Sequence, residues 1–455
     1  MVVQTVINVV LLSVVYILMG IGFAFILNLL GIFNLAHGAI FMASSYGCYL
    51  LVVKVGLPGF VAFPLTVLAA ASLAVWVYLL LGRGAFWRTR ERPDGEPPAR
   101  AAWPAVAAVV PARDEAGVIR ESLSSLLTQD YPGPFAVVLV DDHSGDGTAA
   151  VARQAAHELG RADRLAVARA RPLPEGWAGK VWALAEGVRV AEGLAPGPRY
   201  LWFTDADIAH DAANLRRLVA AAEGGDRDLV SLMVLLSCRG FWERLLIPPF
   251  VFFFQKLYPF AWVNDPGRRT AAAAGGCGLL RRDALARAGG LEPIQGENID
   301  DSALPRRIKA EGRPGGGRIW LGLTRSARSV RPYAGLGEIW RMVARSAYTQ
   351  LRHSPPLLAG TLAGMALTYL VPPLAALAYP LHGNAAAAAL GLGAWALMAL
   401  AFAPTARFYG LSAVFALSLP VAAMLYSVMT FDSARRHAQG RGATWKGRVR
   451  ARAVP

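Results

Sequence analysis

Long apolar runs occupy both ends of the chain. They cover residues 7–30, 36–53 and 60–81 in the first part and 357–381, 385–403 and 411–429 in the last. An α-helix needs about 20 apolar residues to cross a bilayer. We therefore expect membrane-spanning helices at both ends. The first run has no basic segment before it and no cleavage site after it, which disfavours a secretory signal peptide.

Between these regions the hydrophobic pattern changes to short runs that alternate with helical periodicity. Val118, Ile119, Leu123 and Leu126 fall on one face of an expected helix. Strands that alternate with helices indicate an α/β fold with a mostly parallel sheet and helices on both faces. The expected strands are residues 105–110, 135–140, 165–168 and 200–203.

Acidic residues follow two of these expected strands. Asp141 and Asp142 come after the second strand, and Asp205 and Asp207 come after the fourth. Ligands of parallel sheets bind at the carboxyl ends of the strands. Carboxylates gathered there repel one another unless a cation or a donor-rich ligand joins them. An Asp-x-Asp turn can hold Mg²⁺ or Mn²⁺ that also binds a diphosphate.

A second acidic group precedes an expected helix. Glu297, Asp300 and Asp301 stand before the helical positions Leu304 and Ile308. A carboxylate at this place could act as a general base toward a hydroxyl group. It could equally be the N-cap of the helix. Spacing alone favours the cap, and because the two aspartates are adjacent, both roles are compatible.

Composition and charge narrow the class of protein. The chain has 455 residues, of which 55% are hydrophobic and 17% charged, which excludes a disordered chain and disfavours a purely soluble one. The net charge is +15, with basic clusters beside apolar runs at residues 83–92 and 435–452. This placement favours lipid headgroups over nucleic acid. Cys48, Cys238 and Cys277 are too far apart in sequence to indicate a disulfide framework or a zinc site.

The basic cluster at residues 83–92 predicts the orientation of the chain. With Trp87 it is typical of the cytoplasmic face of the inner membrane, so we expect the α/β region to face the cytoplasm. Three later spans would put the basic tail outside, although its charge favours the inside. Pro372 and Pro373 interrupt one of these spans, which could be re-entrant. The apolar segment 245–263 carries Lys256 and prolines, and is typical of an interfacial amphipathic segment.

Several motifs resemble known families. The α/β region is similar to family 2 glycosyltransferases, which have the GT-A nucleotide-sugar-binding fold, at residues 111–115, 140–144, 205–207 and 300–301. A closer resemblance, to membrane glycosyltransferases associated with hopanoid biosynthesis, rests on residues 87–92, 173–180 and 347–352. Residues 1–57 resemble the start of branched-chain amino-acid ABC permeases through residues 20–38. This fragment is too short for a transport pathway.

The resemblance implies a set of site residues. Asp301 would be the catalytic base with Asp300 beside it, and Asp205 and Asp207 would hold Mg²⁺ or Mn²⁺. The partners would be a nucleotide-sugar donor, UDP-linked by expectation, and a lipid acceptor in the membrane. Nucleotide-sugar binding would fall to Pro111, Arg113, Glu115, Asp141, Asp142, Lys180, Asp205 and Arg345.

For some of these positions a plainer interpretation stays open. Lys180 could be a solvated lysine at a helix start, and Arg345 a headgroup contact. His210 could reach the metal, but a histidine at a helix entry is favoured. Residues 275–278 could let backbone approach the acceptor or form a plain glycine turn.

One departure from the family pattern bears on the product. Processive members carry Gln-x-x-Arg-Trp, whereas this chain has Met342 and Ser346 around Arg345. Loss of the tryptophan favours transfer of a single sugar. A processive polysaccharide synthase, a membrane transport component and a non-catalytic nucleotide-sugar-binding subunit are the alternatives.

We expect six parts along the chain. They are a permease-like leader with two membrane helices (1–57), a membrane helix (58–82), a basic juxtamembrane linker (83–104), a GT-A domain (105–355), a C-terminal membrane region (356–430) and a basic tail (431–455).

Overall fold

The computed structural model describes residues 59–93, 102–297, 300–311 and 316–439, and the short paired strands β9 (Thr444–Trp445) and β10 (Arg448–Val449). The two membrane helices predicted within residues 7–53 lie outside the described residues, as does Cys48. The described residues divide into two compact units. The first holds 59–78 and 364–398, and the second holds the rest.

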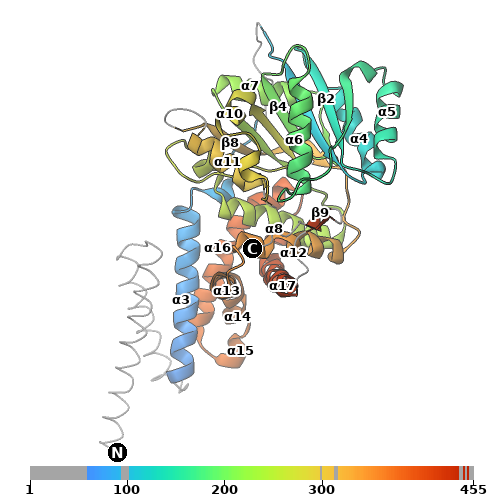
Figure 1. Ribbon diagram of the computed structural model, residues 1–455. Coiled ribbons are helices and arrows are strands. Elements are labelled where there is room, and N and C mark those ends of the chain that lie inside the picture. Colours follow the sequence, from blue (N-terminus) through green and yellow to red (C-terminus); the bar gives the residue numbers. More distant parts are fainter. Residues whose placement is uncertain are drawn as a thin grey trace, which may run out of the picture. The chain divides into compact units, whose positions relative to one another are not determined.

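The second unit is built on an eight-stranded sheet in the order β3-β2-β1-β4-β7-β6-β8-β5 (Figure 1). Its strands are β1 (Val106–Ala112), β2 (Phe135–Asp141), β3 (Leu165–Arg169), β4 (Tyr200–Thr204), β5 (Ile208–His210), β6 (Leu229–Leu235), β7 (Cys277–Arg281) and β8 (Ile319–Ser329). The four strands predicted from the sequence are β1 to β4. They pair in parallel, with Ala112 of β1 opposite Asp141 of β2.

The other half of the sheet is mixed. Strand β7 runs antiparallel to both β4 and β6, and β5 runs antiparallel to β8, whereas β6 and β8 are parallel. The α/β class is therefore confirmed, and parallel pairing dominates the half that carries the acidic strand ends.

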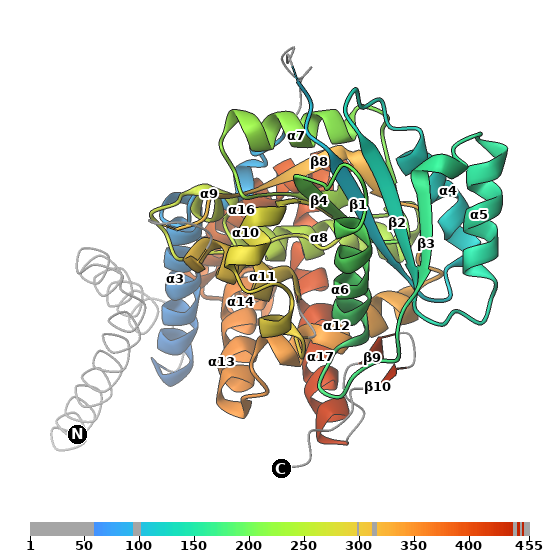
Figure 2. The same ribbon diagram turned by 45° about the horizontal axis from the view of Figure 1, so that its top comes forward.

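Helices cover both faces of the sheet, as the sequence predicts (Figure 2). Strand β1 is buried along its whole length, so its side chains supply both apolar layers, Val109 to one and Val110 to the other. One face packs against α4 (Ala116–Leu127), α5 (Thr148–Glu158) and α7 (Asn214–Gly224), and the other against α6 (Gly179–Glu192), α10 (Arg282–Arg287) and α11 (Asp300–Glu311). Short 3₁₀ turns are η2 (Phe86–Arg88), η3 (Ala162–Arg164) and η4 (Glu292–Ile294).

A second apolar cluster of this unit joins α8 (Phe241–Leu257), α12 (Leu336–Gln350) and α17 (Leu419–Ala438). The segment predicted at 245–263 forms most of α8 and all but the last residue of α9 (Phe260–Asn264). Most of its apolar side chains are buried by protein, while Leu257 is exposed. Its placement on a membrane surface stays a prediction.

Four described helical stretches are long and apolar enough to cross a membrane. They coincide with the runs predicted at 60–81, 357–381, 385–403 and 411–429. They lie in α3 (Gly59–Leu81), in the succession α13 (Pro355–Met365), η5 (Ala366–Leu370) and α14 (Val371–Leu377), in α16 (Ala385–Phe408), and in η6 (Ala413–Ser418) with α17. The short α15 (Tyr379–His382) follows α14. The prolines expected to interrupt the second stretch follow its π-helical turn, η5.

Polar contacts support the packing of the first unit. The indole Nε1 of Trp76 donates to the carbonyl oxygen of Thr368 (2.8 Å), and Asn384 Nδ2 donates to Thr66 Oγ1 (3.0 Å). Buried hydrogen bonds of this kind fix the register of helices whose facing side chains are otherwise mostly apolar.

Candidate active site

Two loops at the carboxyl end of the sheet are bonded to each other. The loop after β1 contains Asp114, whose φ of 51° is in the left-handed region. Its N–H donates to Ser144 Oγ (3.0 Å), and its Oδ1 accepts from the N–H of Gly145 (2.8 Å), both in the loop after β2. These reciprocal bonds hold the predicted motifs 111–115 and 140–144 side by side.

Asp146 ties the same two loops to the starts of α4 and α5. Its carboxylate accepts from the N–H groups of Ala116 (2.9 Å) and Thr148 (3.0 Å). Burial opposes ionisation, but the hydrogen bonds from Thr148 and Ala116 outweigh it and lower the pKa of Asp146. An ionised carboxylate at two helix N-termini is favourable because the unpaired N–H groups there carry partial positive charge.

The two predicted acids after β2 have different surroundings. Asp142 is fully buried, and Arg113 Nη1 donates to its backbone oxygen (2.5 Å) and lies 3.7 Å from its Oδ2. Asp141 is half-buried and accepts from the N–H of Ser144 at 3.1 Å. Arg113 therefore supports the loop, and Asp141 is the acid of this pair with access to solvent.

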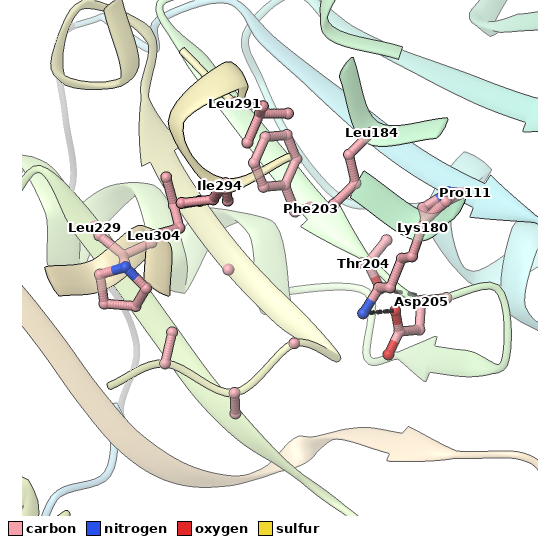
Figure 3. A pocket seen from close by; sticks show the side chains of 15 residues that line it. Pro111, Lys180, Leu184, Phe203, Thr204, Asp205, Leu229, Leu291, Ile294 and Leu304 are labelled. Atoms are coloured by element: carbon pink, nitrogen blue, oxygen red, sulfur yellow. Dashed lines mark hydrogen bonds and ion pairs between the residues drawn. The ribbon is translucent and has the colours of Figure 1, made fainter. Parts of the chain in front are cut away.

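Asp205 lies at the end of β4 and contacts a basic side chain. Lys180, the second residue of α6, places its Nζ 2.9 Å from Asp205 Oδ1 (Figure 3). Pro111 of β1 lines the same pocket. The structure thus brings together three of the predicted site residues from three different elements.

Asp207 contacts a basic residue that the sequence reasoning missed. Arg331 follows β8, and its Nε lies 3.4 Å from Asp207 Oδ2. The same guanidinium forms an ion pair with Glu115, which is largely buried. Strand β8 was not among the predicted strands, so the contact of Arg331 with Asp207 could not be predicted. The apolar run at residues 319–323 was the signal that could have revealed it.

The donor set fits a divalent ion that shares its coordination with a substrate. Asp205 and Asp207 supply carboxylate oxygens, and within the described ranges no group of three His, Cys, Asp or Glu side chains gathers around a common point. Mg²⁺ is commonly bound by one or two carboxylates together with substrate phosphates. Lys180 and Arg331 lie against these two aspartates, where diphosphate oxygens would come.

His210 is part of the protein interior. Asn214 Nδ2 donates to its Nδ1 (3.1 Å), which leaves Nε2 to donate to Thr204 Oγ1 (2.9 Å). Burial lowers its pKa to about 3, so the ring is neutral. Both ring nitrogens are therefore occupied, which favours the interpretation of His210 as a structural histidine.

Arg345 is exposed on α12. Burial raises the pKa of Tyr333 to about 12, with Asp207 and Glu243 adding to the rise and Arg331 and Arg345 opposing it. The charges of Arg345, Arg331 and Asp207 therefore all contribute to the pKa of Tyr333. Among the described residues, Arg345 forms no ion pair with Asp205 or Asp207.

The predicted catalytic pair lies at the start of α11. The helix begins at Asp300, earlier than the periodicity of Leu304 and Ile308 predicts, so Asp300 and Asp301 are its first two residues and the predicted N-cap position of either is wrong. The side chains of both residues fall outside the described part. One turn further along the helix, Leu304 and Pro305 line the pocket that contains Asp205. The backbone therefore brings the predicted base position to the border of the same pocket.

Comparison with known families agrees with this geometry. Residues 107–289 match the profile of glycosyl transferase family 2. The match covers β1 to α10 and includes Asp205 and Asp207, whereas Asp300, Asp301 and Arg331 follow it. Residues 107–289 are therefore similar to glycosyl transferase family 2, and the protein is an enzyme of the glycosyltransferase class.

A second profile matches the N-terminal part. Residues 5–85 match the permease component of the branched-chain amino acid transport system. This match extends beyond the predicted boundary at residue 57 and includes α3. None of the curated proteins matches the chain.

Three of the solved structures that are similar to the chain are as follows. The mannosyltransferase PcManGT from Pyrobaculum calidifontis, solved with GDP-Man and Mn²⁺, is 21% identical; the match covers 83% of this chain and 99% of that one, with a TM-score of 0.47. Glucosyl-3-phosphoglycerate synthase of M. tuberculosis is 17% identical (56% and 85% covered, TM-score 0.36). TarS of S. aureus with UDP-GlcNAc is 15% identical (74% and 92% covered, TM-score 0.34).

Proposed function

We propose that this protein is a membrane-bound, inverting glycosyltransferase that moves a single sugar from a nucleotide-sugar donor to a lipid acceptor. The observation that carries the proposal is the charge arrangement after β4. Two aspartates of an Asp-x-Asp turn are each paired with a cation from another element, Asp205 with Lys180 and Asp207 with Arg331. Two anions suit a divalent ion, and two cations suit the diphosphate bound to it.

The donor would bind across the bonded loops after β1 and β2. Asp141 is the accessible acid for a nucleotide base or ribose, and Pro111 borders the pocket. Asp205 and Asp207 would hold Mg²⁺ or Mn²⁺, which supplies Lewis-acid stabilisation to the departing nucleoside diphosphate. Lys180 and Arg331 would turn from the carboxylates to phosphate oxygens, and Arg345 would add positive charge nearby.

The acceptor would be activated from the start of α11. Asp301 would take the proton of the acceptor hydroxyl, and that oxygen would attack the anomeric carbon. The bond from the anomeric carbon to the diphosphate breaks as the new glycosidic bond forms on the opposite face, so the configuration inverts. Asp300 would stand beside the base in the first turn of α11.

The apolar regions support a lipid acceptor and a location at the inner membrane. Four apolar helical stretches flank or follow the α/β domain, and the basic cluster at residues 83–92 favours the cytoplasmic face of the inner membrane. A lipid acceptor would lie within reach of a domain held at that surface. A hopanoid is the candidate that the motifs at 87–92, 173–180 and 347–352 support, and UDP is the expected nucleotide.

The experiment that tests this proposal replaces the predicted base. Asp301→Asn should lower transfer at least about 100-fold, because it removes proton acceptance. Binding of the nucleotide sugar, measured by calorimetry, should persist. Asp163→Asn, in the exposed turn η3, is the matched control and should leave transfer unchanged. Full transfer by Asp301→Asn would exclude Asp301 as the base.

A further inference from the structure

Three basic residues and a tryptophan gather beside the ends of α3 and α8. Arg83 follows α3 by two residues, Lys256 lies in the last turn of α8, and Trp262 belongs to α9. The guanidinium carbon of Arg83 lies 4.9 Å from the centroid of the Trp262 ring, and that of Arg268 lies 4.8 Å from it. We call these four residues the basic corner.

Arg83 brings a half-buried charge to this corner. Its Nε donates to the carbonyl oxygen of Lys256 (3.1 Å) and its Nη2 to that of Leu257 (3.4 Å), while no carboxylate among the described residues pairs with it. Carbonyls at a helix C-terminus compensate a full charge only in part. Burial and repulsion by Arg83 lower the pKa of Lys256 to about 8. The corner is therefore electropositive, and an anion bound there would relieve this repulsion.

The backbone that carries Trp262 is fixed to the sheet and to α11. Asn264 exchanges two hydrogen bonds with the backbone of Leu321 in β8, at 2.7 and 3.1 Å. Lys309 of α11 donates through its Nζ to the carbonyl oxygen of Thr270 at 2.8 Å. These contacts hold the segment between α9 and residue 270 at both ends. A ligand of the corner would therefore meet a surface that is already ordered, which lowers the entropic cost of binding.

Exposed apolar side chains lie next to the basic corner. Leu81 is 82% exposed and precedes Arg83 by two residues, and Leu257 is 54% exposed and follows Lys256. Leu81 is also the last residue of a stretch long and apolar enough to cross a membrane. Tryptophan and basic residues directly after such a stretch are typical of the headgroup level of a bilayer. The surroundings therefore suit a ligand that carries both a phosphate and hydrocarbon.

We propose that the basic corner binds the phosphate of an anionic phospholipid that is neither the donor nor the acceptor of the transfer reaction. Phosphate oxygens would accept hydrogen bonds from Arg83 and Arg268, and the acyl chains would lie along Leu81 and Leu257. Arg268 pairs with Asp265 at 3.4 Å in an exposed ion pair, which a phosphate can replace at little cost. A zwitterionic lipid would bring a further cation to the corner, so an anionic headgroup is favoured.

A pair of neighbouring arginines tests this site. Native mass spectrometry of the full-length protein in detergent counts bound lipids and measures their Kd. Phosphatidylglycerol should bind at least about ten times more tightly than phosphatidylcholine, and Arg268→Gln should weaken its binding about tenfold through loss of a charge-assisted contact. Arg269→Gln is the matched control, because Arg269 is also exposed and within the described ranges makes no contact with Trp262. It should change the Kd less than about twofold.

Photochemical labelling supplies a second readout that needs no variant. Phosphatidylglycerol that carries a diazirine on its glycerol headgroup is incorporated in nanodiscs with the full-length protein. It should label peptides that contain residues 81–88 or 257–269, and excess unlabelled phosphatidylglycerol should compete. Inorganic phosphate at the same concentration should not compete, which distinguishes a lipid headgroup from a free phosphate ion.

Several outcomes would overturn the site. These are equal Kd values for the two lipids, an equal loss of binding in Arg268→Gln and Arg269→Gln, and labelling confined to other peptides. Competition by inorganic phosphate would assign the corner to a small anion instead of a lipid. Both experiments contain only protein and lipid, without a nucleotide sugar. Failure of this inference is therefore distinguishable from failure of the proposed function, which the Asp301→Asn experiment tests.

Discussion

At the scale of single residues, the site is a set of opposite charges drawn from distant parts of the chain. Arg331 bridges Glu115 of the loop after β1 and Asp207 of the turn after β4. Lys180 reaches Asp205 from the start of α6. These pairs are partly buried, with Glu115 11% and Asp207 25% accessible, and the two aspartates that they involve are the proposed metal ligands. We therefore assign these basic residues to ligand binding rather than to holding the fold.

This assignment predicts the effect of replacing Arg331. Arg331→Gln should weaken binding of a nucleoside diphosphate with Mn²⁺ by about 10–100-fold, since a hydrogen bond to a charged group contributes roughly 1.5–3 kcal/mol. Titration calorimetry with UDP and Mn²⁺ measures it. Arg328→Gln, which removes an exposed pair with Glu121, is the control and should bind normally. Unchanged binding by Arg331→Gln would show that Arg331 does not contact the diphosphate.

His210 predicts a pH dependence of stability. Its pKa falls from 6.5 to about 3 on folding because the ring is buried. Between these values the unfolded chain takes up a proton that the folded chain does not. The free energy of unfolding therefore decreases as pH falls from 6.5 toward 3, by about 1.4 kcal/mol per pH unit for this group.

The measurement is Tm in detergent as a function of pH. His210→Gln should show a shallower fall of Tm between pH 6.5 and 5 than the unsubstituted protein, whatever its stability at pH 7. Equal slopes for the two proteins would mean that His210 is protonated in the folded state.

Some site residues can be predicted from the sequence, and others cannot because their positions depend on tertiary structure. Asp205 and Asp207 directly follow a fully buried strand, and that pattern alone places carboxylates at a ligand-binding edge. Arg331 was missed because its position depends on β8, which pairs with strands far away in sequence. The exclusion of Asp142 from solvent also depends on tertiary packing, which a motif does not reveal.

At the scale of elements, Glu243 connects the loop before α8 to the chain between β8 and α12. Its carboxylate accepts from the N–H groups of Arg239 (2.7 Å), Gly240 (2.8 Å) and Tyr333 (2.8 Å). Burial opposes ionisation, but the bonds from Tyr333 and Gly240 outweigh it and lower the pKa of Glu243. Tyr333 is two residues from Arg331, and from this we infer that the carboxylate also positions the arginine.

Removing this carboxylate should destabilise the second unit. Glu243→Ala leaves three N–H groups without their acceptor, so the free energy of unfolding should fall by about 1–3 kcal/mol. The Kd for UDP with Mn²⁺ should rise as Arg331 loses its support. Glu338→Ala is the comparison, because this carboxylate accepts one exposed N–H, from Ala334. An equal loss of stability in both variants would contradict the structural role of Glu243, and an unchanged Kd in Glu243→Ala would contradict its positioning of Arg331.

The elements that could be predicted are those with a strong local pattern. Strands β1 to β4 are apolar runs that end in polar turns, and α4 shows a clear apolar stripe. Strand β7 reads Cys-Gly-Leu-Leu-Arg, and β5 has three residues, so neither shows a periodicity of its own. Their antiparallel pairing is set by long-range contacts that the alternating pattern does not encode.

At the scale of the whole molecule, a family 2 domain is joined to apolar helices that a permease profile partly matches. The match at residues 5–85 includes α3, whereas every side chain that we assign to donor or acceptor binding follows residue 110. Two expected helices before residue 58 would preserve the orientation of everything that follows. We therefore assign no part of the transfer chemistry to them.

A shortened chain tests this separation. Protein that begins at residue 58 should insert in the membrane and retain transfer within about twofold, because an even number of spans has been removed. The measurement compares activity per membrane-inserted molecule in vesicles. Loss of transfer with normal insertion and normal UDP binding would show that the leader takes part in catalysis.

The central claim is transfer of one sugar to a lipid, and a transfer assay in membranes tests it most directly. The purified protein with Mg²⁺ or Mn²⁺ is offered a panel of nucleotide sugars and a bacterial lipid extract that contains hopanoids. The lipid products are then read by mass spectrometry. We predict a mass gain of one sugar unit that requires both donor and metal and disappears in Asp301→Asn. Addition of long sugar chains, or no gain despite saturable donor binding and a complete lipid extract, would contradict it.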